Sequence, residues 1–427
     1  MKNMYFGDGY AFSEDPEESQ INRNVAVVGG SGSGKTMSVM EMKLLHTDTS
    51  HNMIVNVSKR KLIYKYKPFF EEKGYTVKVL DFDRPESGNA CFDPFDYIHG
   101  PEDWENIKVL SSQVLQVVAN DRDAYWYTAG ESLFLAEIYY LMETKNHVTI
   151  NDVIRFHKRM HVTGTEDAMK TDYDKKFQDL GGDDLAVNYW NTFRTNAPRT
   201  AQCIFSQLND AIFSMFDDKY LDSIGCHPSV KVRDLCERPT VIFVYTSPVN
   251  KSRHALANLF IADMIKELYN YAENTEEGVL PRPVDLLFDD FACGARVAGF
   301  PEYISIFREK GIGVMILLQD ESQLAHTYSP EDAKIIINNC DTYIYMGGMD
   351  LESIENVARR INTPNEDVAD MPLGTEYIIR RGLKPIRAQR YAILNDREYQ
   401  AVTRRYELDI QKRKEKRKQF LENFEIA

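Results

Sequence analysis

The chain has 427 residues, which is enough for a large buried core and roughly two to three domains. Its 43% hydrophobic and 27% charged residues are typical of a soluble globular protein, and its net charge of −14 disfavours a surface coated by nucleic acid without excluding a local basic channel. The sequence has no apolar run near the roughly 18 residues of a membrane span, no signal-peptide core and no CxxC spacing, so we expect a cytoplasmic chain without a zinc site or a disulfide framework.

A glycine-rich stretch at 24–36, NVAVVGGSGSGKT, organises the rest of the sequence. Its apolar run predicts a strand that ends at Val28, and the Gly-x4-Gly-Lys-Thr that follows is the Walker A pattern. In such a loop the backbone N–H groups bind phosphate oxygens, Lys35 reaches the β- and γ-phosphates, and the Thr36 hydroxyl ligates Mg²⁺. The predicted nucleotide-binding residues are Gly29, Gly30, Ser31, Gly32, Ser33, Gly34, Lys35 and Thr36. A glycine-rich turn with a chance lysine is the alternative, but the strand before it and the helix-compatible MSVMEMKLL after it favour nucleotide binding.

The first hundred residues alternate between strand and helix signals. Residues 4–23 are polar and predict a short strand or hairpin beside the nucleotide base. After the glycine-rich loop, helices are expected at 35–46 and 62–73, and strands at 53–57 and 75–81. This β-α-β-α-β alternation predicts a parallel, doubly wound sheet with right-handed crossovers.

Helical periodicity replaces the strand signals from about Trp104 to Asp222. Helices are predicted at 103–120, 126–145, 150–160, 184–195 and 199–216. The polar, glycine-containing stretch 163–184 predicts a mobile loop. We interpret the whole section as an all-α insertion in the nucleotide-binding domain.

Strand character returns at 239–245, a helix is expected at 253–272, and a second run at 284–290, VDLLFDD, ends in two carboxylates. That run has the Walker B form, in which a buried strand places Asp289 in the Mg²⁺ shell and Asp290 beside the attacking water. A core strand that happens to end in acids is the alternative. The glycine-rich loop upstream favours the Walker B interpretation.

The remaining elements are expected to complete the sheet. Helices are predicted at 302–310, 330–339 and 350–361, and strands at 313–318, 342–346, 376–380 and 385–391, the last two forming an edge hairpin. Gln319 follows one of these strands at the edge where open α/β sheets bind ligands, so it is either a γ-phosphate sensor or a simple end to the strand.

The tail from Asp396 onward is predicted to be helical and basic. Its basic cluster consists of Lys412, Arg413, Lys414, Lys416, Arg417 and Lys418. Such a run usually forms a solvated face, and contact with nucleic acid or anionic lipid is the alternative. The predicted organisation is therefore a nucleotide-binding domain in two halves, 1–102 and 229–395, an all-α insertion at 103–228, and a basic helix or tail at 396–427.

Several segments, in order along the chain, resemble one family. They are GGSGSGKT at 29–36, SGNACFDPF at 87–95, DAYW at 123–126 with Ala129, FDDFACGARV at 288–297, the helix of Arg308, ILLQDESQL at 316–324 and NNCDTYIYMGG at 338–348. From about residue 4 to 395 the sequence resembles the coupling-protein ATPases of type IV secretion and conjugation, the TraG/TraD type among the FtsK/HerA-like RecA-fold motors.

The resemblance implies an α/β, RecA-like P-loop NTPase with ATP and Mg²⁺ as cofactors. It also implies a hexamer that delivers relaxase-bound single-stranded DNA, or protein substrates, to a secretion channel at the inner face of the membrane. Asp290 stands where the family usually has a catalytic glutamate, and Gln319 resembles the sensor glutamine. Arg308 occupies the place of an arginine that acts on the nucleotide of the neighbouring subunit, the alternative being a surface salt bridge next to Glu309.

Three departures from the family pattern bear on function. The membrane helices at the amino terminus are absent, which indicates either a truncated chain or a soluble form that docks to a membrane partner. The usual Asp-Pro-Lys-Gly is Val57-Ser58-Lys59-Arg60, so only the lysine is kept. Asp290 is one methylene shorter than glutamate, and displacing a catalytic group by about 1 Å can slow a reaction about a hundredfold.

Three hypotheses follow. The leading one is an ATP-driven motor or gate for conjugative DNA transfer. The second is an ATP-binding recruitment platform with weak or regulatory hydrolysis, which the short Asp290 favours. The third is a related ring ATPase in DNA processing or phage defence that has no secretion partner.

Overall fold

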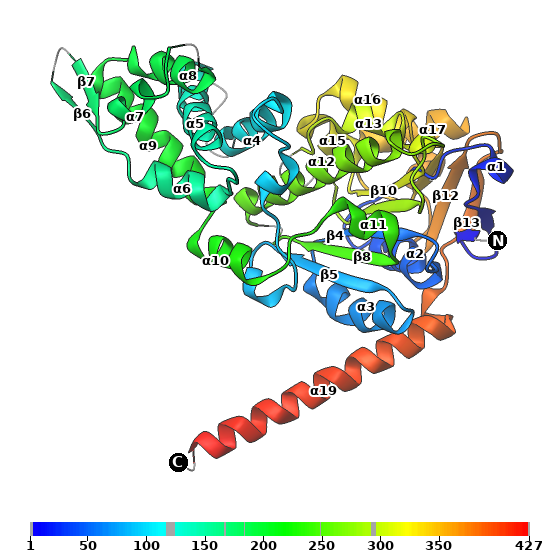
Figure 1. The fold of residues 1–427 in the computed structure, drawn as a ribbon. Helices are drawn as coiled ribbons and strands as arrows, with labels where there is room; N and C mark the ends of the chain where they lie inside the picture. Colours follow the sequence, from blue (N-terminus) through cyan, green and yellow to red (C-terminus); the bar gives the residue numbers. More distant parts are fainter. Residues whose placement is uncertain are drawn as a thin grey trace.

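A nine-stranded sheet, in the order β13-β12-β11-β3-β10-β9-β4-β8-β5, forms the centre of the molecule (Figure 1). The computed structural model describes residues 3–116, 124–165, 168–182, 184–247, 249–291 and 296–425; Asp123 and residues 292–295 of FDDFACGARV lie outside them. The strands are β3 (Val25–Val28), β4 (Asn52–Val57), β5 (Thr76–Asp81), β8 (Thr240–Tyr245), β9 (Val284–Phe288), β10 (Ile312–Leu318), β11 (Thr342–Tyr345), β12 (Thr375–Arg380) and β13 (Ile386–Gln389). All pairs from β11 to β5 are parallel, and β12 and β13 add an antiparallel edge. The doubly wound, mainly parallel sheet and its edge hairpin are thus confirmed.

Helices cover both faces of this sheet, which is why its central strands are continuous apolar runs. In β3 the side chains alternate: Val25 and Val27 pack in one core, and Ala26 and Val28 pack in the other. The helices that accompany the sheet are η1 (Thr36–Met40), α2 (Glu41–His46), α3 (Arg60–Glu72), α11 (Val232–Glu237), α12 (Lys251–Glu273), α13 (Phe300–Ile304), α14 (Phe307–Lys310), α15 (Glu321–Thr327), α16 (Pro330–Asn338), α17 (Leu351–Ile361) and α18 (Asn365–Ala369). The single helix expected over 302–310 is wrong, because α13 and α14 are separate, and α15 and α18 lie where no helix was expected.

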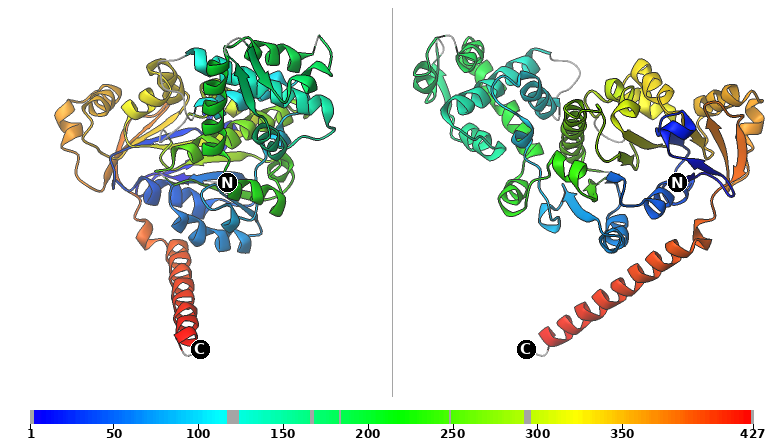
Figure 2. Two further views of the ribbon diagram at one scale, coloured as in Figure 1. Left: turned by 90° about the vertical axis from the view of Figure 1, so that its left-hand side faces the viewer. Right: turned by 45° about the vertical axis from the view of Figure 1, so that its right-hand side comes forward.

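A helical section, residues 104–226, extends from one end of the sheet (Figures 1 and 2). It comprises α4 (Trp104–Gln116), α5 (Ala124–Thr144), α6 (Ile150–Lys158), β6 (Val162–Thr165), β7 (Ala168–Thr171), α7 (Asp174–Gln178), α8 (Leu185–Arg194), α9 (Pro198–Met215) and α10 (Asp218–Cys226). The expected mobile loop at 163–184 is wrong: it contains the antiparallel pair β6–β7 and the helix α7. Phe177 anchors this stretch, since it is buried and stacks on Trp190 with ring centroids 4.2 Å apart. In the part of this section that the structure describes, the elements are therefore helical apart from the β6–β7 pair.

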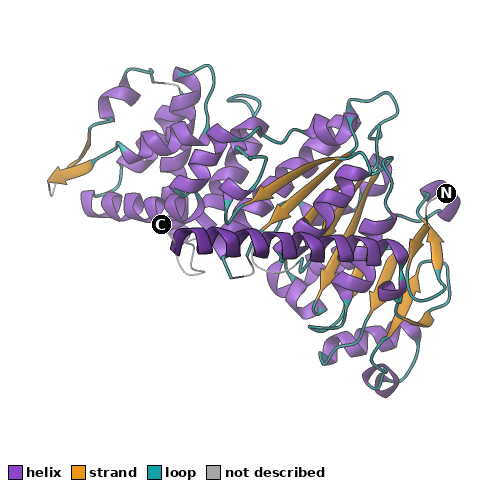
Figure 3. Ribbon diagram, turned by 90° about the horizontal axis from the view of Figure 1, so that it is seen from below, coloured by secondary structure: helices purple, strands orange, loops and turns teal. Residues whose placement is uncertain are grey.

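The amino-terminal segment lies against the edge strand β13. β1 (Asn3–Tyr5) and β2 (Ala11–Ser13) form the expected hairpin, α1 (Pro16–Ser19) follows, and the N–H of Asp8 donates to the carbonyl of Gln389. Short 3₁₀ turns are η2 (Pro85–Ser87), η3 (Pro94–Tyr97) and η4 (Ile393–Asn395). Helix α19 (Arg397–Glu425) starts against α3 and then projects away from the sheet. It extends toward the end of the molecule that carries the helical section (Figures 2 and 3). Among the described residues, none of the helices has the length and apolar character needed to span a membrane.

Candidate functional site

The carboxyl ends of four parallel strands meet at one edge of the sheet. Leu318 of β10 lies opposite Val28 of β3, and Phe288 of β9 lies opposite both Ile316 of β10 and Asn56 of β4. The segments that leave these strands are the glycine-rich loop, the pair of aspartates, Gln319 and Ser58. The structure therefore brings the expected phosphate loop, Walker B acids and sensor residue together at the edge where open α/β sheets bind ligands.

The glycine-rich loop has a backbone that side chains would disturb. Gly32 and Gly34 have φ angles of 77° and 92°, in the region that glycine adopts at no steric cost. A Cβ on Gly29 would lie 2.8 Å from Ser33 Oγ and 3.1 Å from the carbonyl oxygen of Gly347, so no larger residue fits there. The N–H of Gly29 donates to the carbonyl of Leu318 at 3.1 Å, and the N–H of Gly30 donates to that of Gly347 at 2.8 Å. The loop is thus fixed between β10 and the end of β11.

Lys35 and Thr36 start the helix after the loop, and both side chains point into the site. Lys35 is 7% exposed, and its ammonium donates to the carbonyls of Gly29 and, at 3.2 Å, Gly30. Burial lowers its pKa, although the charges of Asp290 and Asp289 act in the opposite direction. A phosphate chain in the loop would offer Lys35 anionic oxygens in place of these neutral carbonyl acceptors.

The Walker A and Walker B segments touch through one hydrogen bond. Thr36 Oγ1 donates to Asp289 Oδ1 at 2.7 Å, and Asp289 is 5% exposed. Burial raises the pKa of Asp289, and the Thr36 hydroxyl partly offsets this. The two oxygens form a small, hard donor set of the kind that binds Mg²⁺ together with nucleotide phosphates. A cation there would compensate the burial of the carboxylate.

Asp290 follows in an unusual backbone conformation. Its φ is 61°, in the left-handed region where Asp is tolerated better than most residues. The Ser58 hydroxyl lies 3.0 Å from Asp289 Oδ2 and 3.3 Å from Asp290 Oδ2, so it can donate to either carboxylate. Ser58 is consequently a site residue, although the sequence analysis assigned no role to it.

Lys59 also belongs to the electrostatics of the site. Its charge adds to the effect of burial that lowers the pKa of Lys35, and it partly opposes the effect of burial that raises the pKa of Asp289. The signal for Ser58 and Lys59 was their place directly after a strand, but only the pairing of β4 with β9 shows that this strand end lies beside the aspartates.

Gln319 and Arg308 lie at opposite ends of β10. Gln319 follows the strand directly, is exposed, and shares the edge with the glycine-rich loop. Arg308 is exposed in α14, just before the strand begins. Because β10 has seven residues at about 3.3 Å each, the two ends are roughly 20 Å apart. The structure thus places Gln319 at the site and Arg308 away from the site of its own chain.

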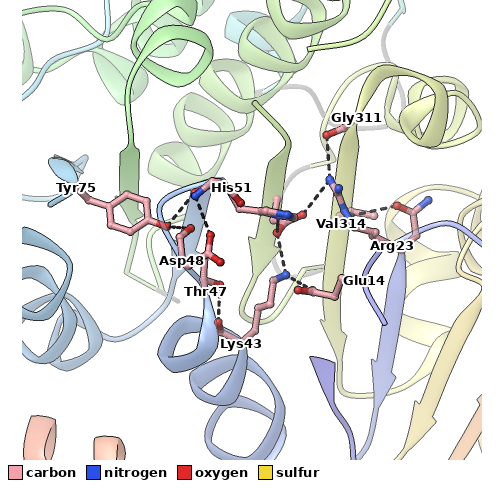
Figure 4. A network of polar contacts seen from close by, with 12 residues as sticks. Glu14, Arg23, Lys43, Thr47, Asp48, His51, Tyr75, Gly311 and Val314 are labelled. Carbon is pink, nitrogen blue, oxygen red and sulfur yellow. Dashed lines mark hydrogen bonds and ion pairs between the residues drawn. The ribbon is translucent and has the colours of Figure 1, made fainter. Parts of the chain in front are cut away.

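A buried ionic network fixes the amino end of the Walker B strand (Figure 4). Asp285 of β9 is 3% exposed and accepts contacts from Lys43 Nζ at 2.9 Å, His51 Nδ1 at 3.0 Å and Arg23 Nη2 at 3.3 Å. Lys43 and Arg23 in particular hold the pKa of Asp285 well below its usual range despite its burial. Lys43 also bonds Glu14 after the amino-terminal hairpin. The network ties β9 to α2, four residues before Asp289.

Comparisons with known proteins agree with this architecture. Residues 1–361 match the family model "Type IV secretory system Conjugative DNA transfer". The solved structure of the bacterial conjugative coupling protein TrwBdeltaN70 in complex with sulphate is similar, with 14% identity, 91% of this chain and 89% of that chain covered, and a TM-score of 0.65.

Two further solved structures are similar in the same way. TrwB in complex with ADP and Mg²⁺ has 14% identity, 86% and 85% coverage, and a TM-score of 0.61. VirB4 of Thermoanaerobacter pseudethanolicus has 13% identity, 92% and 96% coverage, and a TM-score of 0.58. A search of curated proteins gave no match. At these identities the structural likeness shows the RecA-like P-loop NTPase fold.

Proposed function

Because the chain belongs to the conjugative DNA-transfer family of the type IV secretory system, we propose that it is an ATP-binding and ATP-hydrolysing coupling protein. In this role it recruits relaxase-bound single-stranded DNA, or a protein substrate, and drives it into the secretion channel. The observation that supports the proposal best is the 2.7 Å hydrogen bond from Thr36 to Asp289, which joins the expected phosphate loop to the expected Walker B acid.

Each site residue has a role in ATP hydrolysis under this proposal. Lys35 and the loop N–H groups bind the phosphates. Thr36 and Asp289 hold Mg²⁺, which prefers oxygen ligands. Held by these two residues, Mg²⁺ would supply the charge that neutralises the transferred phosphate. Asp290 orients the attacking water, with Ser58 fixing its carboxylate, and Gln319 contacts the γ-phosphate. The similar structure of TrwB in complex with ADP and Mg²⁺ supports a nucleotide and Mg²⁺ as the molecules bound here.

The proposed active form is a homo-hexamer at the cytoplasmic face of the membrane, held there by channel components. Arg308 is too far from its own site, so it would act on the nucleotide of an adjacent subunit. The proposed nucleotide-binding domain comprises 1–102 and 229–395, and the inserted domain is 103–228. The tail 396–427 contains α19, whose basic cluster is exposed.

A recruitment platform with weak hydrolysis is the second candidate. Asp290 and Asp289 compete for the single hydroxyl of Ser58, and the side chain of Asp290 is one methylene shorter than the glutamate usual in the family. Both features favour a slow chemical step. Steady-state ATPase assays with and without single-stranded DNA separate the two candidates. A motor gives ATP turnover that single-stranded DNA stimulates. In Lys35→Ala, ATP binding or turnover should be abolished. A platform binds ATP but gives little turnover in either condition. ATP binding and turnover equal to those of the wild type in a folded Lys35→Ala protein would overturn both.

A further inference from the structure

Arg390 lies against the phosphate loop from the side that the Walker B acids do not occupy. It follows β13, and its Nη1 is 3.5 Å from the point where a Cβ on Gly34 would lie. Nη2 donates to the carbonyl of Met346 at 2.7 Å, and Nε donates to that of Thr375 at 3.3 Å. The guanidinium is thus fixed at the end of β11 with one nitrogen toward the loop.

The strand order tells which part of a nucleotide this nitrogen faces. Around β3, the neighbour β10 and the next strand β9 bring Gln319, Asp289 and Asp290 to one flank of the loop. These are the residues expected at the γ-phosphate and Mg²⁺. Arg390 comes from the opposite flank, which β11, β12 and β13 form. It therefore faces the end of the phosphate chain that is remote from the γ-phosphate.

Within the described residues, no carboxylate is hydrogen-bonded to Arg390. The nearby acid is Glu376 on β12, which is 1% exposed and acts on Arg390 only through its charge. Burial raises the pKa of Glu376 to about 7, and the charge of Arg390 only partly opposes this. The guanidinium is half-buried, so it pays a desolvation cost that a phosphate contact would relieve.

We propose that Arg390 is a nucleotide-binding residue that contacts the α- and β-phosphates beside Gly34. The inference rests on the proposed function, because it needs the loop to bind a nucleotide. It assigns to the edge hairpin β12–β13 a part in nucleotide binding, through a charged side chain that is bonded to the residue after β11 and lies beside Gly34.

The test is titration calorimetry of the full chain with adenosine, AMP, ADP and ATP in buffer containing Mg²⁺. Arg390→Gln should weaken ADP and ATP by the same factor, about tenfold or more, because a charge-assisted contact to phosphate is lost. Adenosine binding should be unchanged. Arg390→Lys should recover part of the loss. Arg387→Gln is the matched control, since Arg387 is an exposed arginine of the same hairpin, and it should bind all four ligands like the wild type.

The outcomes separate this inference from the proposed function. Wild-type binding of ADP and ATP by Arg390→Gln overturns the inference alone, provided that Lys35→Ala loses binding. An equal loss for adenosine, together with a lower melting temperature in both Arg390→Gln and Arg390→Lys, also overturns it, because Arg390 would then only join β11 to β12. A wild-type chain that binds neither ADP nor ATP overturns the proposed function itself.

Discussion

Replacing Arg308 by alanine tests whether the catalytic site is shared between subunits. The ends of β10 are roughly 20 Å apart, and at that distance in water a unit charge acts on another with only about 0.2 kcal/mol. Arg308 therefore contributes almost nothing to hydrolysis within its own chain. An arginine that reaches the γ-phosphate from a neighbour is worth on the order of a thousandfold or more in rate. Arg308→Ala should keep ATP affinity and lose turnover by about this factor.

The assay measures ATPase activity per chain over a range of protein concentrations, with assembly followed by light scattering. Wild-type activity per chain should rise as rings form, and Arg308→Ala should assemble but stay inactive. Mixing Arg308→Ala with Lys35→Ala should restore turnover, because some interfaces then pair an intact phosphate loop with an intact arginine. Arg359→Ala is the matched control: Arg359 is also exposed, and its ion pair with Glu355 is a surface pair worth under about 1 kcal/mol.

Two results would refute this reasoning. One is normal turnover in Arg308→Ala, which would leave the residue as a surface arginine. The other is a set of mixed rings that stay inactive although co-assembly has been verified. Activity that does not depend on protein concentration would likewise argue against a shared site.

Three further predictions concern the acids and the charge of the chain. Asp290→Asn should bind ATP and Mg²⁺ but not hydrolyse ATP, whereas Asp289→Asn should weaken Mg²⁺-dependent binding in calorimetry; equal binding losses would contradict these roles. Asp285→Asn should destabilise the protein at pH 7 by about 3 kcal/mol in urea unfolding, since it leaves buried cations unpaired. The folded-state pKa of Asp285 is depressed, so its contribution to stability is present above about pH 4, the unfolded value, and falls as the pH drops further. A difference in unfolding free energy between the wild type and Asp285→Asn that widens in acid would exclude this account. Single-stranded DNA should bind the isolated chain weakly and with a steep salt dependence, as filter binding between 50 and 200 mM salt would show; tight, salt-insensitive binding would contradict it.

The sheet could be predicted from the sequence because its signals are local. Mostly apolar runs such as 284–288 are long enough to be fully buried, and this one is followed by the two aspartates at the ligand edge. The Walker A spacing likewise depends only on neighbouring residues, and Gly32 and Gly34 have the positive φ angles that the loop needs. The alternation of strands and helices along the chain was sufficient to predict a parallel sheet with right-handed crossovers.

The parts that could not be predicted depend on contacts between distant segments. The role of Ser58 follows from the pairing of β4 with β9, which are far apart in the sequence. Helix α15 has seven residues and is capped by Asp320, whose carboxylate accepts from the N–H of Gln323; so short a helix shows little periodicity. The stretch 163–184 looked like a loop because it is polar, and the burial of Phe177 depends on its stacking against Trp190.

The placement of the site at one edge of the sheet also favours a head-to-tail assembly. The phosphate loop is closed on one flank by Asp289, Asp290 and Gln319, and on the other by the edge hairpin with Arg390. Arg308 lies at the opposite ends of the strands, so under the proposed function the amino edge of one subunit must meet the ligand edge of the next. Such a contact joins two different surfaces, so after one contact has formed the pair still offers one free surface of each kind. Repeating the contact with a rotation that closes produces a ring, and in a ring every phosphate loop receives an arginine. An open pair would complete only one of its two sites, so activity per chain should approach its maximum only when the ring closes.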